Sequence, residues 1–213
     1  SPDSYEINLA TYNDNGTPET TDDSITQESE TISLTKSALC ENPIFKTAIL
    51  DVEGENVGYL MYNGFVSDFN NQLNTVFGDF KANNVQHLVL DLRYNPGGFV
   101  SSALAISGMI TGQFKGEIFS KEEWNSKWQS ELEKSDPESL TNHFTDRLTN
   151  GNSINSLELS NVHFIVTKKS ASASELVISS LSPYINVRMV GNQTVGKYVA
   201  STTLYDSKNF GKN

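Results

Sequence analysis

From Phe45 onward, short runs of apolar and β-branched residues alternate with segments whose apolar residues recur at helical spacing. Short apolar runs are typical of strands, and recurrence every three to four residues is typical of helices. Strands that alternate with helices pack as an α/β layered domain. We therefore predict an α/β fold. Its strands are expected at residues 46–50, 57–62, 85–92, 162–167, 186–190 and 198–205, and its helices at residues 65–81, 99–110 and 173–181.

Residues 113–158 interrupt this alternation. The stretch is polar and contains both tryptophans of the chain, Trp124 and Trp128. It is long enough to form a small helical subdomain of its own. We predict a polar helical insertion, which acts either as a lid or as a surface excursion without a role in the site.

Residues 1–35 are rich in Asp and Glu and contain no Lys or Arg. Such a segment has too little apolar surface to offset the entropy lost on ordering. Ile7, Leu9 and Tyr12 alternate with polar residues and could add one strand. We predict that residues 1–43 are an acidic linker or the remnant of an upstream domain.

Composition excludes several classes of function. The net charge of −11 disfavours a nucleic-acid partner, because such binding depends on clustered Lys and Arg. The single cysteine, Cys40, cannot form an intramolecular disulfide, and three histidines supply few metal ligands. No apolar run approaches the roughly 18 residues of a membrane span, and no signal peptide is visible. We expect no metal or cofactor, and membrane contact only through an anchor outside this sequence.

Residues 191–197 match the first seven positions of a phosphate-binding P-loop, G-x-x-x-x-G-K. Tyr198 stands where Ser or Thr should bind magnesium. The residues after it alternate like a strand, so no helix N-terminus would face a phosphate. We interpret the match as coincidental.

Two serine-based motifs are also weak. Ser33 and Lys36 fit the S-x-x-K motif of penicillin-recognising enzymes, but its S-D-N and K-T-G partners are absent. A Ser-His-Asp triad is disfavoured because G-x-S-x-G is absent. His87 and His163 lie inside apolar strands, where a structural histidine is the commoner outcome.

Three other features fit a single kind of chemistry. The run S-A-S-A-S-E at residues 170–175 joins a predicted strand to a predicted helix, and a nucleophile at such a corner has free backbone N–H groups beside it. Residues 95–98, N-P-G-G, form a second such corner, where glycines admit a substrate carbonyl and N–H groups could stabilise an oxyanion. Lys197 follows the flexible Gly196.

A lysine acts as a general base only when it is neutral, so burial must lower its pKa from about 10.4 by several units. The apolar neighbours Val195 and Tyr198 are expected to provide that burial. Each feature alone also has a structural interpretation: a small-residue helix start, a tight turn and a surface lysine.

Over roughly residues 44–205 the chain resembles the S41 family of serine peptidases, the tail-specific or C-terminal processing proteases. The resemblance rests on four stretches of sequence. These are residues 57–60 (VGYL) leading to Phe65, residues 89–98 (VLDLRYNPGG), residues 170–175 (SASASE), and Gly191 with residues 194–197 (TVGK).

The resemblance implies a ClpP/crotonase-like fold and a Ser-Lys dyad of Ser172 and Lys197. It also implies an oxyanion hole formed by the N–H of Ala173 and one from Gly97 or Gly98, with Gly97 favoured. Ser170 and Ser174 would then be helpers or spacers. Glu175 is expected to cap or orient. Many members carry an orienting glutamine four residues after the lysine, where this chain has Ser201.

The domain expected from the resemblance is a peptidase core over residues 44–213 with the insertion at 113–158, incomplete at its C-terminal end. The implied function is a serine endopeptidase that cleaves protein or peptide substrates through an acyl-enzyme, in the cell envelope, periplasm or medium. The alternative is a peptide-binding module that keeps the fold without turnover.

Overall fold

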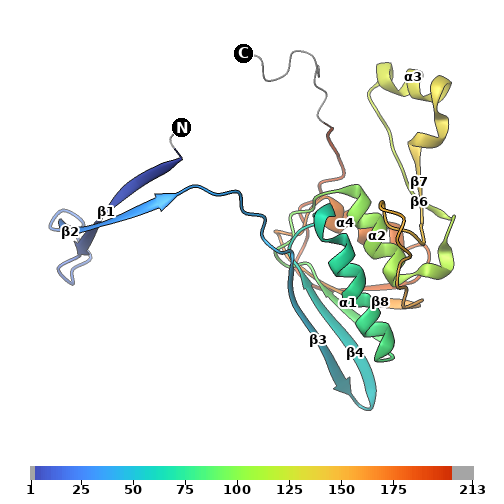
Figure 1. The fold of residues 1–213 in the computed structure, drawn as a ribbon, viewed down its shortest axis with the longest axis horizontal. Helices are drawn as coiled ribbons and strands as arrows, with labels where there is room; N and C mark the ends of the chain where they lie inside the picture. Colours follow the sequence, from blue (N-terminus) through green and yellow to red (C-terminus); the bar gives the residue numbers. More distant parts are fainter. Residues whose placement is uncertain (1–2, 203–213) are drawn as a thin grey trace. The chain divides into compact units, whose positions relative to one another are not determined.

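The computed structural model describes residues 3–202, in two compact units, Ser1–Glu41 and Asn42–Asn213. Each unit has its own strands (Figure 1). No helix within the described range is both long and apolar enough to cross a membrane.

The first unit is an antiparallel hairpin of β1 (Ser4–Asn13) and β2 (Ser24–Thr35). Tyr5 lies opposite Leu34, and Ile7 lies opposite Ile32. Such apolar cross-strand pairs stabilise a hairpin even in an acidic segment. The segment thus forms two strands where its sequence suggested one. That residues 1–43 are an acidic linker or the remnant of an upstream domain stays a prediction.

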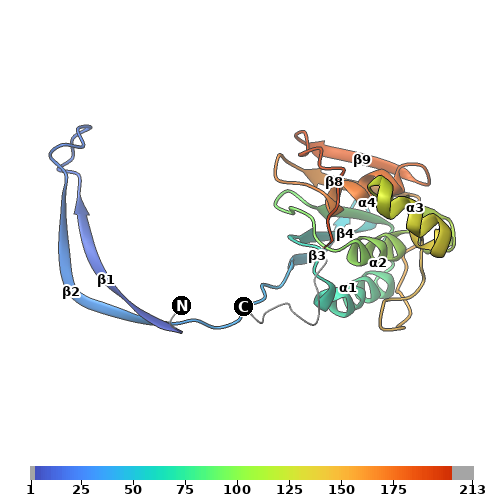
Figure 2. The same ribbon diagram turned by 90° about the horizontal axis from the view of Figure 1, so that it is seen from above.

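The second unit contains a five-stranded sheet in the order β3-β4-β5-β8-β9. Only the pairing of β3 with β4 is antiparallel. Helices α1, α2 and α4 cover one face, as Figure 2 shows. This confirms the predicted α/β class; the finer ClpP/crotonase-like assignment stays a prediction. The bounds are β3 (Ile44–Val52), β4 (Glu55–Tyr62), β5 (His87–Asp91), β8 (Asn161–Val166), β9 (Asn186–Gly191), α1 (Asn70–Ala82), α2 (Val100–Ile110) and α4 (Ala173–Leu181).

Alternating strand residues fix which face of the sheet is covered. Leu60 and Tyr62 on β4, and Leu88 and Leu90 on β5, are fully buried under the helices. Their neighbours in sequence point to the other face and are mostly half-buried. Period-two alternation of this kind places one side-chain set in the core. The apolar runs of the sequence therefore located the sheet correctly.

The insertion is helical only in part. Helix α3 (Ser126–Ser135) and the turns η2 (Gly112–Phe114) and η3 (Pro137–Leu140) accompany a two-stranded antiparallel sheet of β6 (Ile118–Lys121) and β7 (Thr141–His143). Phe119 and Phe144 pack edge to face, with ring centroids 5.3 Å apart. Phe119 lies on β6, and Phe144 directly follows β7. The prediction of a polar helical insertion did not include these strands.

Strands β3 and β4 are joined by a two-residue turn, with positive φ at Glu53 (56°) and Gly54 (86°), as a type I′ hairpin requires. One strand expectation needs correction. The strand predicted at residues 198–205 is absent from residues 198–202. Its last three residues lie outside the described range.

The topology gathers three loops at one edge of the sheet. Strands β5, β8 and β9 are parallel, so their C-terminal ends share this edge. Residues 92–99, 167–172 and 192–197 follow these three ends. The crevice at the carboxyl ends of parallel strands is where α/β folds bind their ligands.

Candidate active site

Ser172 stands at the N-cap of α4 with φ 55° and ψ −114°. A non-glycine residue rarely adopts this conformation, which costs about 1–3 kcal/mol and persists only where the surroundings impose it. Ala171 and Ala173 on either side are buried, whereas Ser172 is only half-buried. The sharp turn thus presents one hydroxyl between two small residues.

The neighbouring serines have structural roles. Ser170 Oγ donates to Leu92 O (2.7 Å) and accepts from Thr167 N (3.0 Å). Ser174 Oγ donates to Asn95 O (3.0 Å). Both side chains are fully buried. Ser172 is therefore the one accessible hydroxyl of the three, and the other two anchor its loop to the loop after β5.

Asn95 joins the loop after β5 (residues 92–99, here the glycine loop) to the loop after β8 (residues 167–172, here the serine loop). Its Nδ2 donates to Tyr62 O (2.8 Å), and its Oδ1 accepts from Gly97 N (2.9 Å). Its own carbonyl accepts from Ala171 N (3.1 Å) as well as from Ser174 Oγ. Asn95 is fully buried, so each of these bonds forms away from water. From its place before Pro96 and the two glycines, Asn95 was expected only to form a turn.

Gly97 lies directly against the serine loop. Its φ is +105°, and a Cβ added there would lie 2.7 Å from Ser172 Cβ and 2.8 Å from Ala171 O. Real side chains do not approach this closely, so only glycine fits. This confirms that residues 95–98 and residues 170–175 meet in space.

The backbone amides beside Ser172 differ in their hydrogen bonds. Gly97 N–H donates to Asn95 Oδ1, so it is already engaged. For Gly98 N–H and Ala173 N–H, no acceptor is found among residues 3–202. Of the two glycine amides named from the sequence, the one at Gly98 is therefore the freer donor.

Glu175 connects the serine loop to the segment that carries Lys197. Its Oε2 accepts from Ser172 N (2.8 Å) and Lys197 N (2.9 Å), and its Oε1 accepts from Gly196 N (2.5 Å). Desolvation alone would raise the Glu175 pKa. Hydrogen bonds from Thr194 and from the three amides outweigh it, and the net pKa is lowered. One carboxylate thus holds the backbones of Ser172 and Lys197 together.

Glu175→Gln is expected to lower the free energy of unfolding at neutral pH. The difference between the variant and the wild-type protein should become smaller in acid. The folded pKa lies below the usual 4.5. The carboxylate's contribution is therefore complete above about 4.5 and is lost as pH falls through the folded pKa. Denaturant unfolding of both proteins between pH 3 and 7 measures this difference. Glu131→Gln on the exposed face of α3 is the control; equal pH profiles for Glu175→Gln and the control would contradict the role of Glu175.

The Lys197 side chain does not match the sequence expectation of burial. Lys197 is exposed, and its flanking residues Val195 and Tyr198 are 55% and 97% exposed. No hydrogen bond or ion pair of Lys197 Nζ occurs within the described part of the chain. Ser201, in the position of the orienting glutamine, is also exposed. The structure therefore brings the Lys197 backbone to Ser172 without burying the amine.

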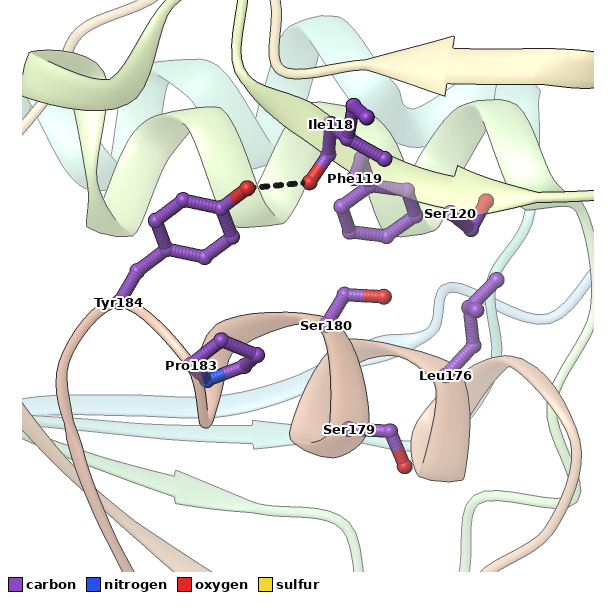
Figure 3. Close-up of a pocket in the computed structure, with 8 residues that line it drawn as sticks. All are labelled: Ile118, Phe119, Ser120, Leu176, Ser179, Ser180, Pro183 and Tyr184. Carbon is purple, nitrogen blue, oxygen red and sulfur yellow. Dashed lines mark hydrogen bonds between the residues drawn. The ribbon is translucent and has the colours of Figure 1, made fainter.

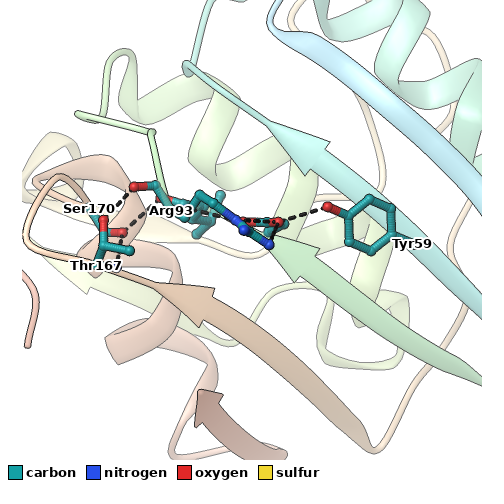
Figure 4. A network of polar contacts seen from close by, with 6 residues as sticks. Tyr59, Arg93, Thr167 and Ser170 are labelled. Atoms are coloured by element: carbon teal, nitrogen blue, oxygen red, sulfur yellow. Dashed lines mark hydrogen bonds and ion pairs between the residues drawn. The ribbon is translucent and has the colours of Figure 1, made fainter. Parts of the chain in front are cut away.

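An ion pair between the partly exposed Arg93 and the buried Asp91 supports the same edge of the sheet (Figure 4). Asp91 is fully buried and binds Arg93 Nη2 at 2.6 Å and Tyr59 Oη at 2.7 Å. Desolvation opposes the charge on Asp91, but hydrogen bonds from Arg93 and Tyr59 lower its pKa overall. Thr167 Oγ1 donates to Arg93 O, which ties β8 to the loop after β5. An Asp two residues before an Arg at a strand end was the available sequence signal.

The motifs set aside in the sequence lack the structure that their proposed functions require. No helix follows residues 191–197 in the described structure, so the P-loop match has no helix N-terminus. Ser33 and Lys36 lie at the end of β2, in the first unit. His87 begins β5, at the end of the strand away from the site, and pairs with Glu55 at 2.7 Å.

The other two histidines lie on strands. His163 pairs with Val89 within the sheet, and His143 ends β7. Among residues 3–202, no three His, Cys, Asp or Glu side chains gather so that they could hold a metal ion.

Comparison with known proteins identifies the class that this fold and site define. Residues 56–209 match Peptidase family S41. The chain therefore belongs to the S41 family of peptidases, as its resemblance implied.

Particular relatives agree with this assignment. A "Probable CtpA-like serine protease" of Staphylococcus epidermidis is 29% identical over 148 residues, which are 70% of this chain and 26% of the relative. Its Staphylococcus aureus counterpart is 27% identical over 148 residues, with 69% and 26% coverage. The chain thus spans about a quarter of the length of these curated relatives.

Solved structures show the same fold. A "Putative S41 protease" from Bacteroides fragilis has a TM-score of 0.67 at 24% identity, covering 98% of this chain and 52% of that one. The photosystem II D1 C-terminal processing protease has a TM-score of 0.52 at 18% identity, with 79% and 41% coverage. At these identities the likeness concerns the fold alone.

Proposed function

We propose that the chain forms the catalytic core of a serine endopeptidase in which Ser172 is the nucleophile and Lys197 the general base. The observation that carries this proposal is the Glu175 carboxylate, one oxygen of which accepts from both Ser172 N and Lys197 N. A nucleophile and a base must be held within reach of each other. Membership of the S41 family supports the same assignment.

The proposed reaction proceeds in two steps. Neutral Lys197 takes the Ser172 hydroxyl proton while Oγ attacks the peptide carbonyl. Ala173 N–H and Gly98 N–H stabilise the resulting oxyanion. The C–N bond then breaks, and the leaving amine takes the proton from Lys197. In the second step Lys197 deprotonates a water that attacks the acyl-enzyme ester, and Ser172 leaves with the proton.

A neutral lysine needs desolvation, because burial disfavours the charged ammonium form. The described residues leave Lys197 exposed. We therefore infer that the bound peptide covers Lys197 and excludes water from its amine.

The second candidate function is peptide binding without turnover. The exposed Lys197 and the serine at position 201 favour it. Both candidates use the same crevice and a protein or peptide partner. They differ in whether the Ser172 hydroxyl is activated. Location in the envelope, periplasm or medium stays a prediction for either.

A fluorophosphonate probe is expected to label wild-type protein at Ser172. Such probes react with an activated serine, so labelling separates an enzyme from a binding module. Mass spectrometry of the digested protein locates the modified residue. Labelling should disappear in Lys197→Ala and persist in Lys121→Ala, a control on β6. A wild-type protein that is folded but unlabelled would favour the binding module.

A further inference from the structure

A groove of about 430 Å³ runs between helix α4 and strand β6 (Figure 3). One wall is the α4 side, with Leu176, Ser179 and Ser180. The opposite wall comes from the insertion, which contributes Ile118 and Phe119 on β6. The groove therefore needs both the core and the insertion.

The groove begins at Leu176, one helical turn from Ser172. Residues four and seven to eight positions along a helix share one face, which places Leu176, Ser179 and Ser180 below Ser172 on α4. Leu176 N donates to Ser172 O (2.8 Å), so these two residues are one turn apart. At the far end, Tyr184 Oη donates to Ile118 O (2.7 Å) and joins the two walls.

The dimensions suit an extended segment of peptide. The eight steps from Ser172 to Ser180 rise roughly 12 Å along the helix, at about 1.5 Å per residue. An extended peptide covers that distance with about four residues, at roughly 3.3 Å each. A peptide with its carbonyl at Ser172 would thus place its next few residues in the groove.

The lining selects for apolar side chains. It contains Ile118, Phe119, Leu176 and Pro183 and no charged residue. A charged side chain bound there would lose water without gaining a partner. The Ser179 and Ser180 hydroxyls have no hydrogen-bond partner within the described range, so they are free for the peptide backbone.

We propose that this groove, defined by residues 118–120, Leu176, Ser179, Ser180, Pro183 and Tyr184, binds an apolar segment of about four residues beside the scissile bond. This inference rests on the proposed function. It gives the insertion a role as one wall of the substrate site, where the sequence left open a lid or a surface excursion.

Peptide binding to the Ser172→Ala protein tests the groove without cleavage. The probe is a fluorescein-labelled peptide of eight alternating leucines and alanines with a lysine at each end, measured by fluorescence anisotropy. A matched peptide has serine in place of leucine. We expect the leucine peptide to bind at least tenfold more tightly, and Ser179→Glu or Ile118→Glu to weaken it at least tenfold.

Ser182→Glu is the matched control, because Ser182 ends the same helix outside the groove and is exposed. It should leave the Kd unchanged. Circular dichroism confirms that each variant is folded. Equal binding of the two peptides, or equal effects of Ser179→Glu and Ser182→Glu, would overturn the groove.

The two proposals fail in different ways. Binding as expected, with no cleavage and no probe labelling of Ser172 in the wild-type protein, would overturn the peptidase proposal and leave the groove as a binding surface. If the groove variants cleave peptide as fast as the wild-type protein, the groove proposal is wrong and the peptidase proposal stands.

Discussion

Ser172→Ala and Lys197→Ala are each expected to lower peptide hydrolysis by about 10⁴-fold or more. Loss of a nucleophile or of its base removes most of the chemical acceleration, and the oxyanion donors alone sustain only a small residual rate. The measurement is kcat/KM on a fluorogenic peptide, with the folded state checked by thermal unfolding. Both variants should unfold close to the wild-type temperature.

The S-x-x-K residues of the first unit supply the matched controls. Ser33→Ala and Lys36→Ala make the same two side-chain changes far from the site in sequence, and both should keep full activity. A histidine base is tested by His87→Gln, His143→Gln and His163→Gln. Loss of activity in a folded histidine variant, with Lys197→Ala still active, would refute the dyad.

Gly97→Ala is expected to destabilise the protein by about 2–5 kcal/mol and to remove activity. The new methyl group would lie 2.7–2.9 Å from Ser172 Cβ, Ala171 O and Ala173 N, so one loop must move. Overpacking against backbone atoms combined with a positive φ lies at the high end of single-substitution costs. Denaturant unfolding gives the stability, and the fluorogenic peptide gives the activity.

Gly116→Ala isolates the backbone part of that effect. Gly116 also has a positive φ, +87°, but a Cβ there meets nothing within 4 Å. Its cost should be about 1 kcal/mol, from the left-handed conformation alone, without loss of activity. Similar costs for the two substitutions would mean that the loops around Ser172 relax freely.

Sequence patterns predicted the helices and strands that depend mainly on residues near one another in the chain. The helix expected at residues 173–181 is α4 with the same bounds, because the small residues before it and the apolar face within it mark both the turn and the helix. Strands β5 and β8 were likewise visible as apolar runs between breakers. Both the resemblance and these runs placed Ser172 at a strand-to-helix corner.

Features that depend on distant partners could not be read this way. The β1–β2 hairpin depends on pairs such as Tyr5 with Leu34, which a count of acidic residues conceals. The burial expected for Lys197 from its neighbours failed, because apolar residues next to it in sequence are exposed in space. The engagement of the Gly97 amide depends on the rotamer of Asn95, which no sequence pattern reports.

The hydrogen bonds of Asn95 also bear on when the site forms during folding. Asn95 contacts Tyr62, 33 residues earlier, and Ser174, 79 residues later. Contacts of such sequence separation form late, because a long loop must close before they contribute. During synthesis the loop that contains Asn95 emerges well before the loop that contains Ser172, so the Asn95 carbonyl lacks these partners until residues 171–174 have been made. The strained Ser172 conformation is therefore a product of the finished fold, so on the proposed mechanism a partly folded chain would lack an organised nucleophile.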